Sequence, residues 1–172
     1  MTTHETSGSD TEHQDESSQW RQADRFSLDS VAITATACEP SLVPTPNGVA
    51  LVSQSCDVVL PHRLNVQVAP IIELVDDDAR AARDGKRSQY AHLPQLGENS
   101  FADLDHMSTV AKSALSGKHV GQGAVGDDEA RRFAAAIARR FGRFAFPDDV
   151  SDAMKALRDL VQSKATKDSR SN

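Results

Sequence analysis

Short apolar segments separated by turn-forming residues occupy the first two thirds of the chain, and they constrain its fold more than any other feature. Phe26 and Leu28, followed by Val31 and Ile33, are spaced two residues apart, which is the period of a half-buried strand. Further short strands are expected at residues 49–52, 66–74, 89–93, 101–104 and 107–111. Five or six short strands joined by turns predict a small barrel or sandwich.

The segments between these strands carry different signals. Residues 34–47 contain three prolines, which predicts an irregular connection. Residues 76–87 are acidic and then mixed in charge, which predicts a polar loop. Pro70 interrupts the strand expected at residues 66–74, and it indicates a bulge or a sheet edge because proline has no N–H to donate.

The last third of the chain predicts helices. Three acids at residues 127–129 suit a helix N-terminus, and Gly142 suits its C-terminal cap. The apolar stripe expected on this helix consists of Ala130, Phe133, Ala134, Ile137, Ala138 and Phe141. A second, weaker helix is expected after Pro147.

Both ends of the chain are polar. Residues 1–19 contain no aliphatic side chain after Met1 and predict a disordered acidic tail, and residues 164–172 predict a frayed end. The N-terminus lacks the basic and apolar regions of a secretory signal, and no apolar run approaches the roughly 18 residues of a membrane span. Two cysteines, Cys38 and Cys56, fit a reducing compartment. These features predict a cytoplasmic protein without a membrane partner.

The acidic charge of the chain is unevenly distributed. The formal net charge is −6, from 25 acidic and 19 basic residues. The first 20 residues hold five of the acids and no Lys or Arg, so the remainder has 20 acidic and 19 basic residues. A nearly neutral domain does not exclude nucleic acid as a partner.

Residues 53–57 form the most distinctive short string, and they follow directly after a predicted buried strand. A thiolate at Cys56 is a candidate nucleophile, with His62, or else His92 or His106, as its base. The neighbouring Asp57 opposes this chemistry because a nearby negative charge raises a thiol pKa. A structural or positioning role for the string is therefore favoured, with Ser53 and Gln54 as contact residues. The catalytic candidates are Cys56, Asp57 and His62.

Two further patterns favour structural interpretations. The cysteines and histidines show neither CxxC nor HxxxH spacing, so no metal site is expected. Gly121, Gly123 and Gly126 match GxGxxG before the predicted helix, but residues 113–120 make a poor strand and three acids occupy the position of a pyrophosphate. A flexible connection ending in a helix cap is the better interpretation, and no cofactor is expected.

Arginines are concentrated on the predicted helix. Pairs spaced eight residues apart are expected to share its solvent face and form a cationic strip that meets phosphates or an acidic partner. The alternative is a solvated face on which Arg serves helix propensity. The residues of this strip are Arg131, Arg132, Arg139 and Arg140, with Arg143 just beyond.

Residues 103–115 resemble the closing segment of PemK/MazF-type toxins, which typically reads "DQLRTVDKSRL". The matching positions are Asp105, Thr109, Val110, Lys112, Ser113 and Leu115. Residues 21–24, 48–54 and 66–71 are similar, in the same order, to the opening turn, central strand and "VVVAPI" strand of that family. The resemblance spans about residues 20–142. It implies an α+β fold, mainly β, with a small SH3-like barrel, usually dimeric, in bacterial toxin–antitoxin or phage-defence biology.

The expected organisation is a disordered tail at residues 1–19, the barrel at 20–115, a helical extension at 116–163 and a second disordered tail at 164–172. The family's ribonuclease members use an Arg before the central strand and a Thr or Ser after "API". Here these positions read Asn47-Gly48 and Ile72-Glu73, and Ala23 replaces the glycine of the opening turn. The resemblance therefore does not carry the nuclease residues over.

Three functions remain open. The leading hypothesis is a binding module for RNA or for a protein partner, such as an antitoxin or a neighbouring defence subunit, with a homodimer as the family's usual assembly. The second is a divergent endoribonuclease that cleaves single-stranded RNA through relocated residues such as Asp57, His62, His106 or Arg63. The third is a structural subunit of a larger complex.

Overall fold

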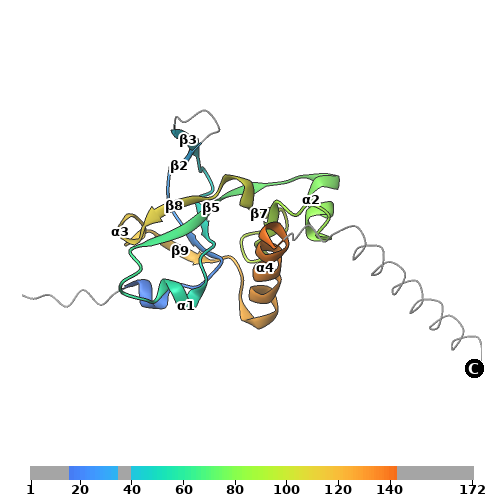
Figure 1. Ribbon diagram of the computed structural model, residues 1–172. Helices are drawn as coiled ribbons and strands as arrows, with labels where there is room; N and C mark the ends of the chain where they lie inside the picture. The colour runs from blue at the N-terminus through green and yellow to red at the C-terminus, as the bar shows by residue number, and fades with distance from the viewer. Residues whose placement is uncertain (1–15, 35–39, 143–172) are drawn as a thin grey trace, which may run out of the picture. The chain divides into compact units, whose positions relative to one another are not determined.

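A mixed set of short strands and helices makes up the computed structural model, which describes residues 16–34 and 40–142 (Figure 1). The strands are β1 (Asp24–Phe26), β2 (Ser30–Thr34), β3 (Pro40–Pro44), β4 (Val49–Leu51), β5 (Asn65–Glu73), β6 (Tyr90–His92), β7 (Ser100–Asp103), β8 (Ser108–Ala111) and β9 (His119–Gln122). The helices are α1 (Ser55–Val58), α2 (Asp76–Arg83), α3 (Lys112–Leu115) and α4 (Gly126–Phe141), with 3₁₀ turns η1 (Glu16–Gln19) and η2 (Leu104–His106).

Strand β5 is the centre of a seven-stranded antiparallel sheet. The strand order is β6-β7-β5-β4-β1-β9, and β8 also pairs with β5. β4 pairs with residues 68–70 of β5, whereas β8 pairs with residues 65–68 and β7 with residues 71–73. The α+β class predicted from the sequence is confirmed. Helix and strand contents are about equal, so the fold is not mainly β.

The described strands do not close into a barrel. β2 and β3 form a separate two-stranded sheet, and no described strand joins β9 to the opposite end of the main sheet. The β2–β3 hairpin meets β8 through a side chain: the Ser108 hydroxyl donates to the Ala32 carbonyl at 2.5 Å. In a closed barrel, backbone hydrogen bonds would join the two strands at this place. The closed SH3-like barrel expected from the sequence is therefore wrong for the described residues, which form an open sheet.

Pro70 lies where the pairing of β5 is interrupted, as its position in the sequence predicts. On one edge of β5 the Ile71 N–H donates to the Gly48 carbonyl at 3.0 Å. N–H groups alternate between the edges of a strand, so the missing N–H of Pro70 faces the other edge. There the partner changes from β8 to β7, and η2 bulges out between them. The interruption leaves no N–H of β5 without a partner at this position, because proline has no N–H.

Two segments predicted to be irregular form regular structure. β3 lies in the Pro-rich connection and pairs with β2 from Ser30↔Pro44 to Thr34↔Pro40. α2 replaces the predicted acidic loop, because the acids at residues 76–78 suit a helix N-terminus and the helix buries its own Ala79 and Ala82. The expected order of strands at β4 to β8 is otherwise confirmed.

β9 forms in a segment whose sequence makes a poor strand. It pairs with β1, and His119 Nε2 lies 3.2 Å from the buried Asp24 carboxylate. Burial raises the pKa of Asp24, whereas the Arg21 N–H and His119 lower it. The cross-strand partners of β1, rather than local propensity, thus hold this strand.

α4 forms as predicted but buries a different face. Phe133 and Ala136 are buried and Ile137 is partly buried, while Ala134 and Ala138 are exposed. Phe133 and Ala136 join a core cluster with residues of β4, β5, β6 and β7 and with Ala23, which precedes β1. The expected stripe was rotated because small alanines do not show which side of a helix meets the core. The second predicted helix, with Arg143, lies outside the described residues.

Two of the expected segment boundaries are crossed by contacts of the described residues. Glu16, at the end of the expected acidic tail, starts η1, and its carboxylate accepts from Ser116 Oγ and Gly117 N at 3.0 Å each. α4 belongs to the compact unit that ends at Phe141, together with the sheet. The sheet and α4 therefore share one core across the boundary expected at residue 115.

The backbone at Gly123 joins three parts of this core. Its N–H donates to the Ala23 carbonyl at 2.9 Å, and its own carbonyl accepts from the Gln95 N–H at 3.2 Å. A Cβ at this position would lie 2.5 Å from the Ala23 oxygen and 2.7 Å from Leu93 Cδ2. The glycine in the GxGxxG pattern is thus required by close packing just before α4.

We expect Gly123→Ala to lower the free energy of unfolding by about 1–3 kcal/mol, because its Cβ overlaps a backbone oxygen. Gly121→Ala is the matched control, since a Cβ there meets nothing within 4 Å. Urea unfolding followed by circular dichroism measures both. Equal midpoints for the two variants would contradict the packing role of Gly123.

Candidate anion-binding site

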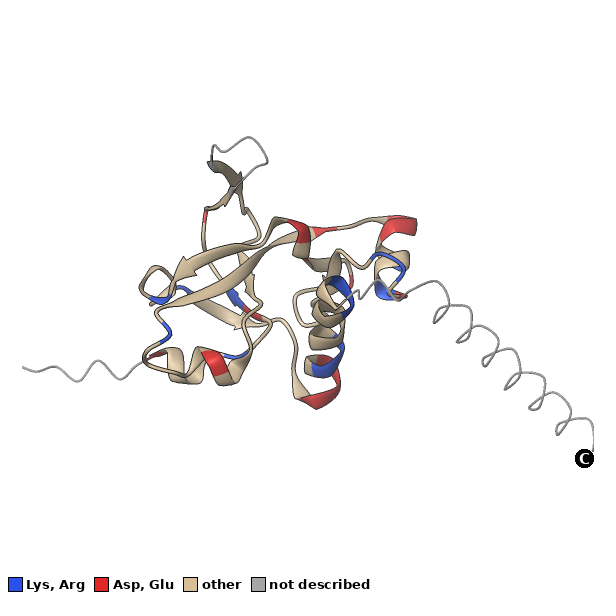
Figure 2. Cartoon of the chain, in the orientation of Figure 1, with Lys and Arg blue, Asp and Glu red and all other residues tan. Residues whose placement is uncertain are grey.

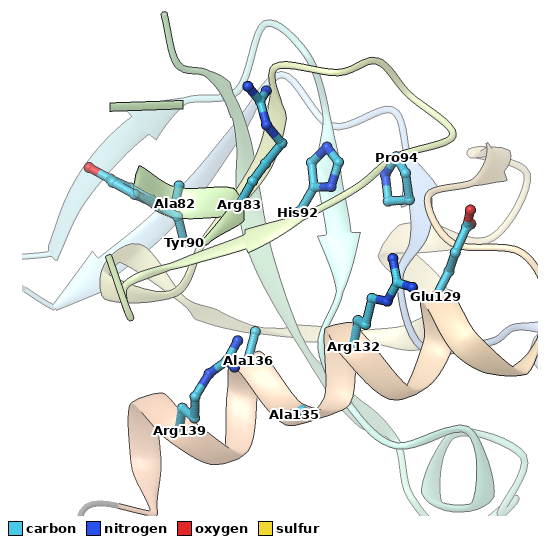
Figure 3. Close-up of a pocket in the computed structure, with 10 residues that line it drawn as sticks. All are labelled: Ala82, Arg83, Tyr90, His92, Pro94, Glu129, Arg132, Ala135, Ala136 and Arg139. Carbon is cyan, nitrogen blue, oxygen red and sulfur yellow. The ribbon is translucent and has the colours of Figure 1, made fainter. Parts of the chain in front are cut away.

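A cavity of about 400 Å³ opens between α2, β6 and α4 (Figure 3). α2 contributes Ala82 and Arg83, β6 contributes Tyr90 and His92, and Pro94 follows β6. The α4 wall consists of Glu129, Arg132, Ala135, Ala136 and Arg139. The volume falls in the range of small-ligand pockets, and three guanidinium groups give the lining its character.

The arginines of α4 divide into two sets. Figure 2 shows that α4 is acidic at its start and basic along the rest of its length. Arg131 forms ion pairs with Asp127 and Asp128 at 3.5 and 3.9 Å, and Arg140 pairs with Asp105. These two arginines are committed to acids and do not line the cavity.

Arg132 and Arg139 form the other set, and both line the cavity. They are seven residues apart, which is about two helical turns, so they share a face. The eight-residue pairing expected from the sequence was wrong, because the eighth residue is rotated by about 80° from the first. No ion pair joins either guanidinium to an acid within the described ranges 16–34 and 40–142.

The third guanidinium, of Arg83, is already neutralised. It donates to the Glu98 carbonyl at 2.9 Å and to Asn99 Oδ1 at 3.1 Å, and it lies 3.5 Å from the Glu98 carboxylate. Figure 3 shows its tip pointing away from α4. Arg83 therefore lines the wall with its stem and fixes the loop before β7.

Glu129 ties α4 to the loop that follows β6. Its carboxylate accepts from Gln95 Nε2 at 3.0 and 3.1 Å and from the Val125 N–H at 2.7 Å. The Val125 N–H, and then Gln95, lower the pKa of this carboxyl. Glu129 is thus an ionised anchor whose oxygens are occupied by neutral donors, and it sets the position of the arginines one and three turns further along.

His92 and Tyr90 supply the ring-bearing wall of the cavity. The His92 Nε2–H donates to the Glu98 carbonyl at 3.0 Å, and the imidazole lies 5.0 Å from the Phe101 ring centroid. Burial lowers the pKa of His92, and the nearby Arg83 lowers it further, against the opposing effect of the hydrogen bond to Glu98. The imidazole is therefore mainly neutral at pH 7.

A second, smaller cavity of about 230 Å³ gathers polar side chains around the end of β4. Ser53 and Asp57, both predicted site residues, line it together with Arg63 before β5 and Thr109 on β8. Ser53 Oγ accepts from the Gln67 N–H at 2.8 Å. The structure thus brings a carboxylate and a guanidinium from adjacent elements into one cavity.

Cys56 and His62, the other catalytic candidates, do not line this cavity. Cys56 is exposed on α1, and its Sγ lies 3.6 Å from Gln54 Oε1. His62 is exposed, and His106 is bound to Asp103 at 2.7 Å. No hydrogen bond between Cys56 and a histidine is present in the described part of the chain, so the thiolate chemistry stays a prediction.

Sequence reasoning missed Arg83 and Tyr90, and it named His92 only as an alternative base for Cys56. Tyr90 and His92 are two residues apart in a predicted strand, so they had to share a face. That signal was available, but nothing local shows that α4, some 40 residues later, covers that face. Arg83 was hidden because its helix was interpreted as a loop.

Comparisons with known proteins do not show a family for this chain. No protein-family model matches the chain, and no curated protein matches it in sequence. Within residues 16–34 and 40–142, no three His, Cys, Asp or Glu side chains gather as metal ligands, and Cys38 lies outside these ranges. No helix in the same ranges is both long and apolar enough to span a membrane.

We expect the stability of the protein to fall, relative to His92→Gln, as the pH decreases from about 8 to about 5. The pKa of His92 is lower in the folded state, so the unfolded state binds more protons below its ordinary pKa, and acid favours unfolding. Urea unfolding of both proteins across this range tests the effect. A difference in unfolding free energy that stays constant with pH would contradict it.

Proposed function

We propose that this chain is a module that binds single-stranded RNA through the cavity between α2, β6 and α4. The observation that carries the proposal is the pair Arg132 and Arg139, which line the cavity and form no ion pair within the described ranges. Guanidinium groups bind phosphate oxygens through paired, charge-assisted hydrogen bonds. Two such groups in one cavity favour a phosphate-bearing ligand.

The ring-bearing wall supports an unstacked base as the second part of that ligand. Tyr90 and His92 lie across the cavity from α4 (Figure 3). Proteins read single-stranded RNA by stacking splayed bases on such rings, whereas a duplex keeps its bases inside. A cavity of about 400 Å³ suits one nucleotide rather than a helix groove.

The biological setting we propose is a cytoplasmic bacterial toxin–antitoxin or phage-defence system, in which an antitoxin or a neighbouring defence subunit is the protein partner. The resemblance of residues 103–115 to PemK/MazF-type toxins supports this setting, and the consecutive pairing of β7 and β8 with β5 is compatible with it. Binding is favoured over cleavage at this cavity, because no carboxylate there is free of hydrogen-bonded donors.

We expect Arg132→Ala and Arg139→Ala each to weaken binding of a single-stranded RNA by about tenfold or more, the effect of losing a hydrogen bond to a charged group. Fluorescence anisotropy with a labelled oligonucleotide measures the Kd. The salt dependence should also weaken, by roughly 0.7 in the log–log slope for each lost phosphate contact. Thermal unfolding of each variant shows that it is folded.

Arg80→Ala is the matched control, because Arg80 is an exposed α2 residue paired with Asp77 outside the cavity. It should change the Kd by less than about twofold. An equal loss in the Arg80 and Arg132 variants would mean that net charge, not the cavity, binds RNA. An Arg131→Ala loss equal to that of Arg132→Ala would assign binding to the whole helix surface instead.

A second candidate function is RNA cleavage in the smaller cavity, and the shared position of Asp57 and Arg63 favours it. In-line cleavage needs a base for the 2′-hydroxyl and a cation for the phosphate. Asp57 would take the 2′-hydroxyl proton as that oxygen attacks phosphorus, and Arg63 would neutralise the phosphate. The 5′-oxygen would leave with a proton from water.

For this second function we expect Asp57→Asn to slow cleavage by about 100-fold or more, because the amide cannot accept the proton. Asp29→Asn, at an exposed acid that does not line the cavity, should cleave normally. Incubation of end-labelled RNA with each protein, followed by gel electrophoresis, gives the rates. Cleavage that survives Asp57→Asn but is lost in Cys56→Ala would return the chemistry to the thiol.

A further inference from the structure

The charges around the larger cavity are not balanced by the protein itself. Glu98 neutralises Arg83, and the Glu129 oxygens accept hydrogen bonds from Gln95 and Val125. Arg132 and Arg139 remain as two guanidinium groups without an ion-pair partner in the described ranges. With the ionised Glu129 in the same lining, the cavity keeps one excess positive charge. An anionic ligand that accepts hydrogen bonds from both guanidinium groups would complete the site.

The two arginines can reach a common ligand. Their Cα atoms are about 10 Å apart along the helix, from seven residues at 1.5 Å each. Ala135 and Ala136, which lie between them on the cavity wall, leave this space open because their side chains are short. Figure 3 shows both arginines extending from α4 on the side of β6. The Arg139 guanidinium packs beside Gly85, where a Cβ added to the glycine would lie 3.4 Å from Arg139 Cζ.

Phosphate esters differ in how well they match two guanidinium groups. A phosphodiester inside an RNA strand carries one negative charge, whereas a terminal phosphomonoester carries about 1.5 to 2 at pH 7 and presents three acceptor oxygens. Two guanidinium forks can each take a pair of hydrogen bonds from such a group.

We propose that the cavity recognises a terminal phosphomonoester on a nucleotide, with Arg132 and Arg139 on the phosphate and the base against Tyr90 and His92. This inference rests on the proposed RNA-binding function, and it names which part of the RNA is bound. The same chemistry has two sources, an RNA end and a free mononucleotide. An internal phosphodiester is the ligand that this site selects against.

The experiment compares four probes on the full chain: one short single-stranded RNA with a 5′-phosphate, the same RNA with a 3′-phosphate, the same RNA with hydroxyls at both ends, and adenosine 5′-monophosphate. Isothermal titration calorimetry measures each Kd. We expect one of the phosphorylated RNAs to bind about tenfold or more tightly than the hydroxyl RNA, since an added charge-assisted pair contributes that much. Arg132→Ala and Arg139→Ala should each remove this preference, and Arg80→Ala should retain it.

The outcomes separate this inference from the proposed function. Equal affinity for all three RNAs, with loss in the arginine variants, would overturn end recognition and leave RNA binding standing. Binding of adenosine monophosphate without binding of any RNA would overturn the RNA function and support a free nucleotide as the ligand. Absence of binding by all four probes would overturn both. Arg132→Lys, which keeps the charge and loses the fork, should retain fold and only part of the end preference.

Discussion

The contact of Gly123 with Ala23 and Leu93 decides where α4 lies, and the larger cavity depends on it. At this point the chain leaves β9, touches the start of β1 and accepts a hydrogen bond from the loop after β6. No side chain fits between these backbones. The helix that follows therefore begins at a set place beside β6, and Phe133 and Ala136 complete the core from there. The site is built on a close backbone contact rather than on a motif that binds a ligand.

The electrostatics of α4 follow from its position. Acids at the start of the helix and on η2 pair with Arg131 and Arg140. The helix turns Arg132 and Arg139 toward β6, where the only nearby carboxylate among the described residues that line the cavity, Glu129, is bound to neutral donors. One helix thus carries arginines of two kinds, and only packing distinguishes them. Charge counts over the whole chain, which is acidic, say nothing about this local surplus.

The candidate site was partly visible in the sequence. Arg132 and Arg139 belonged to the predicted cationic strip, and Ser53 and Asp57 belonged to the string that the smaller cavity gathers. Arg83 was missed because three consecutive acids were interpreted as a loop, although acids also begin helices. Cys56 drew attention as a reactive residue type, yet it lies exposed beside Gln54. Residue type suggested chemistry that the neighbours of that residue do not support.

By itself, the sequence determined the α+β class, most of the strands, the interrupted pairing at Pro70 and the existence of α4. These features depend on periodicity and on the missing proline N–H, which are local properties. Tertiary structure alone decided that the sheet stays open, which face of α4 is buried and which arginines remain unpaired. It also joined α2, β6 and α4 around one cavity. Contacts between segments tens of residues apart depend on how whole elements pack, and no local pattern encodes that packing.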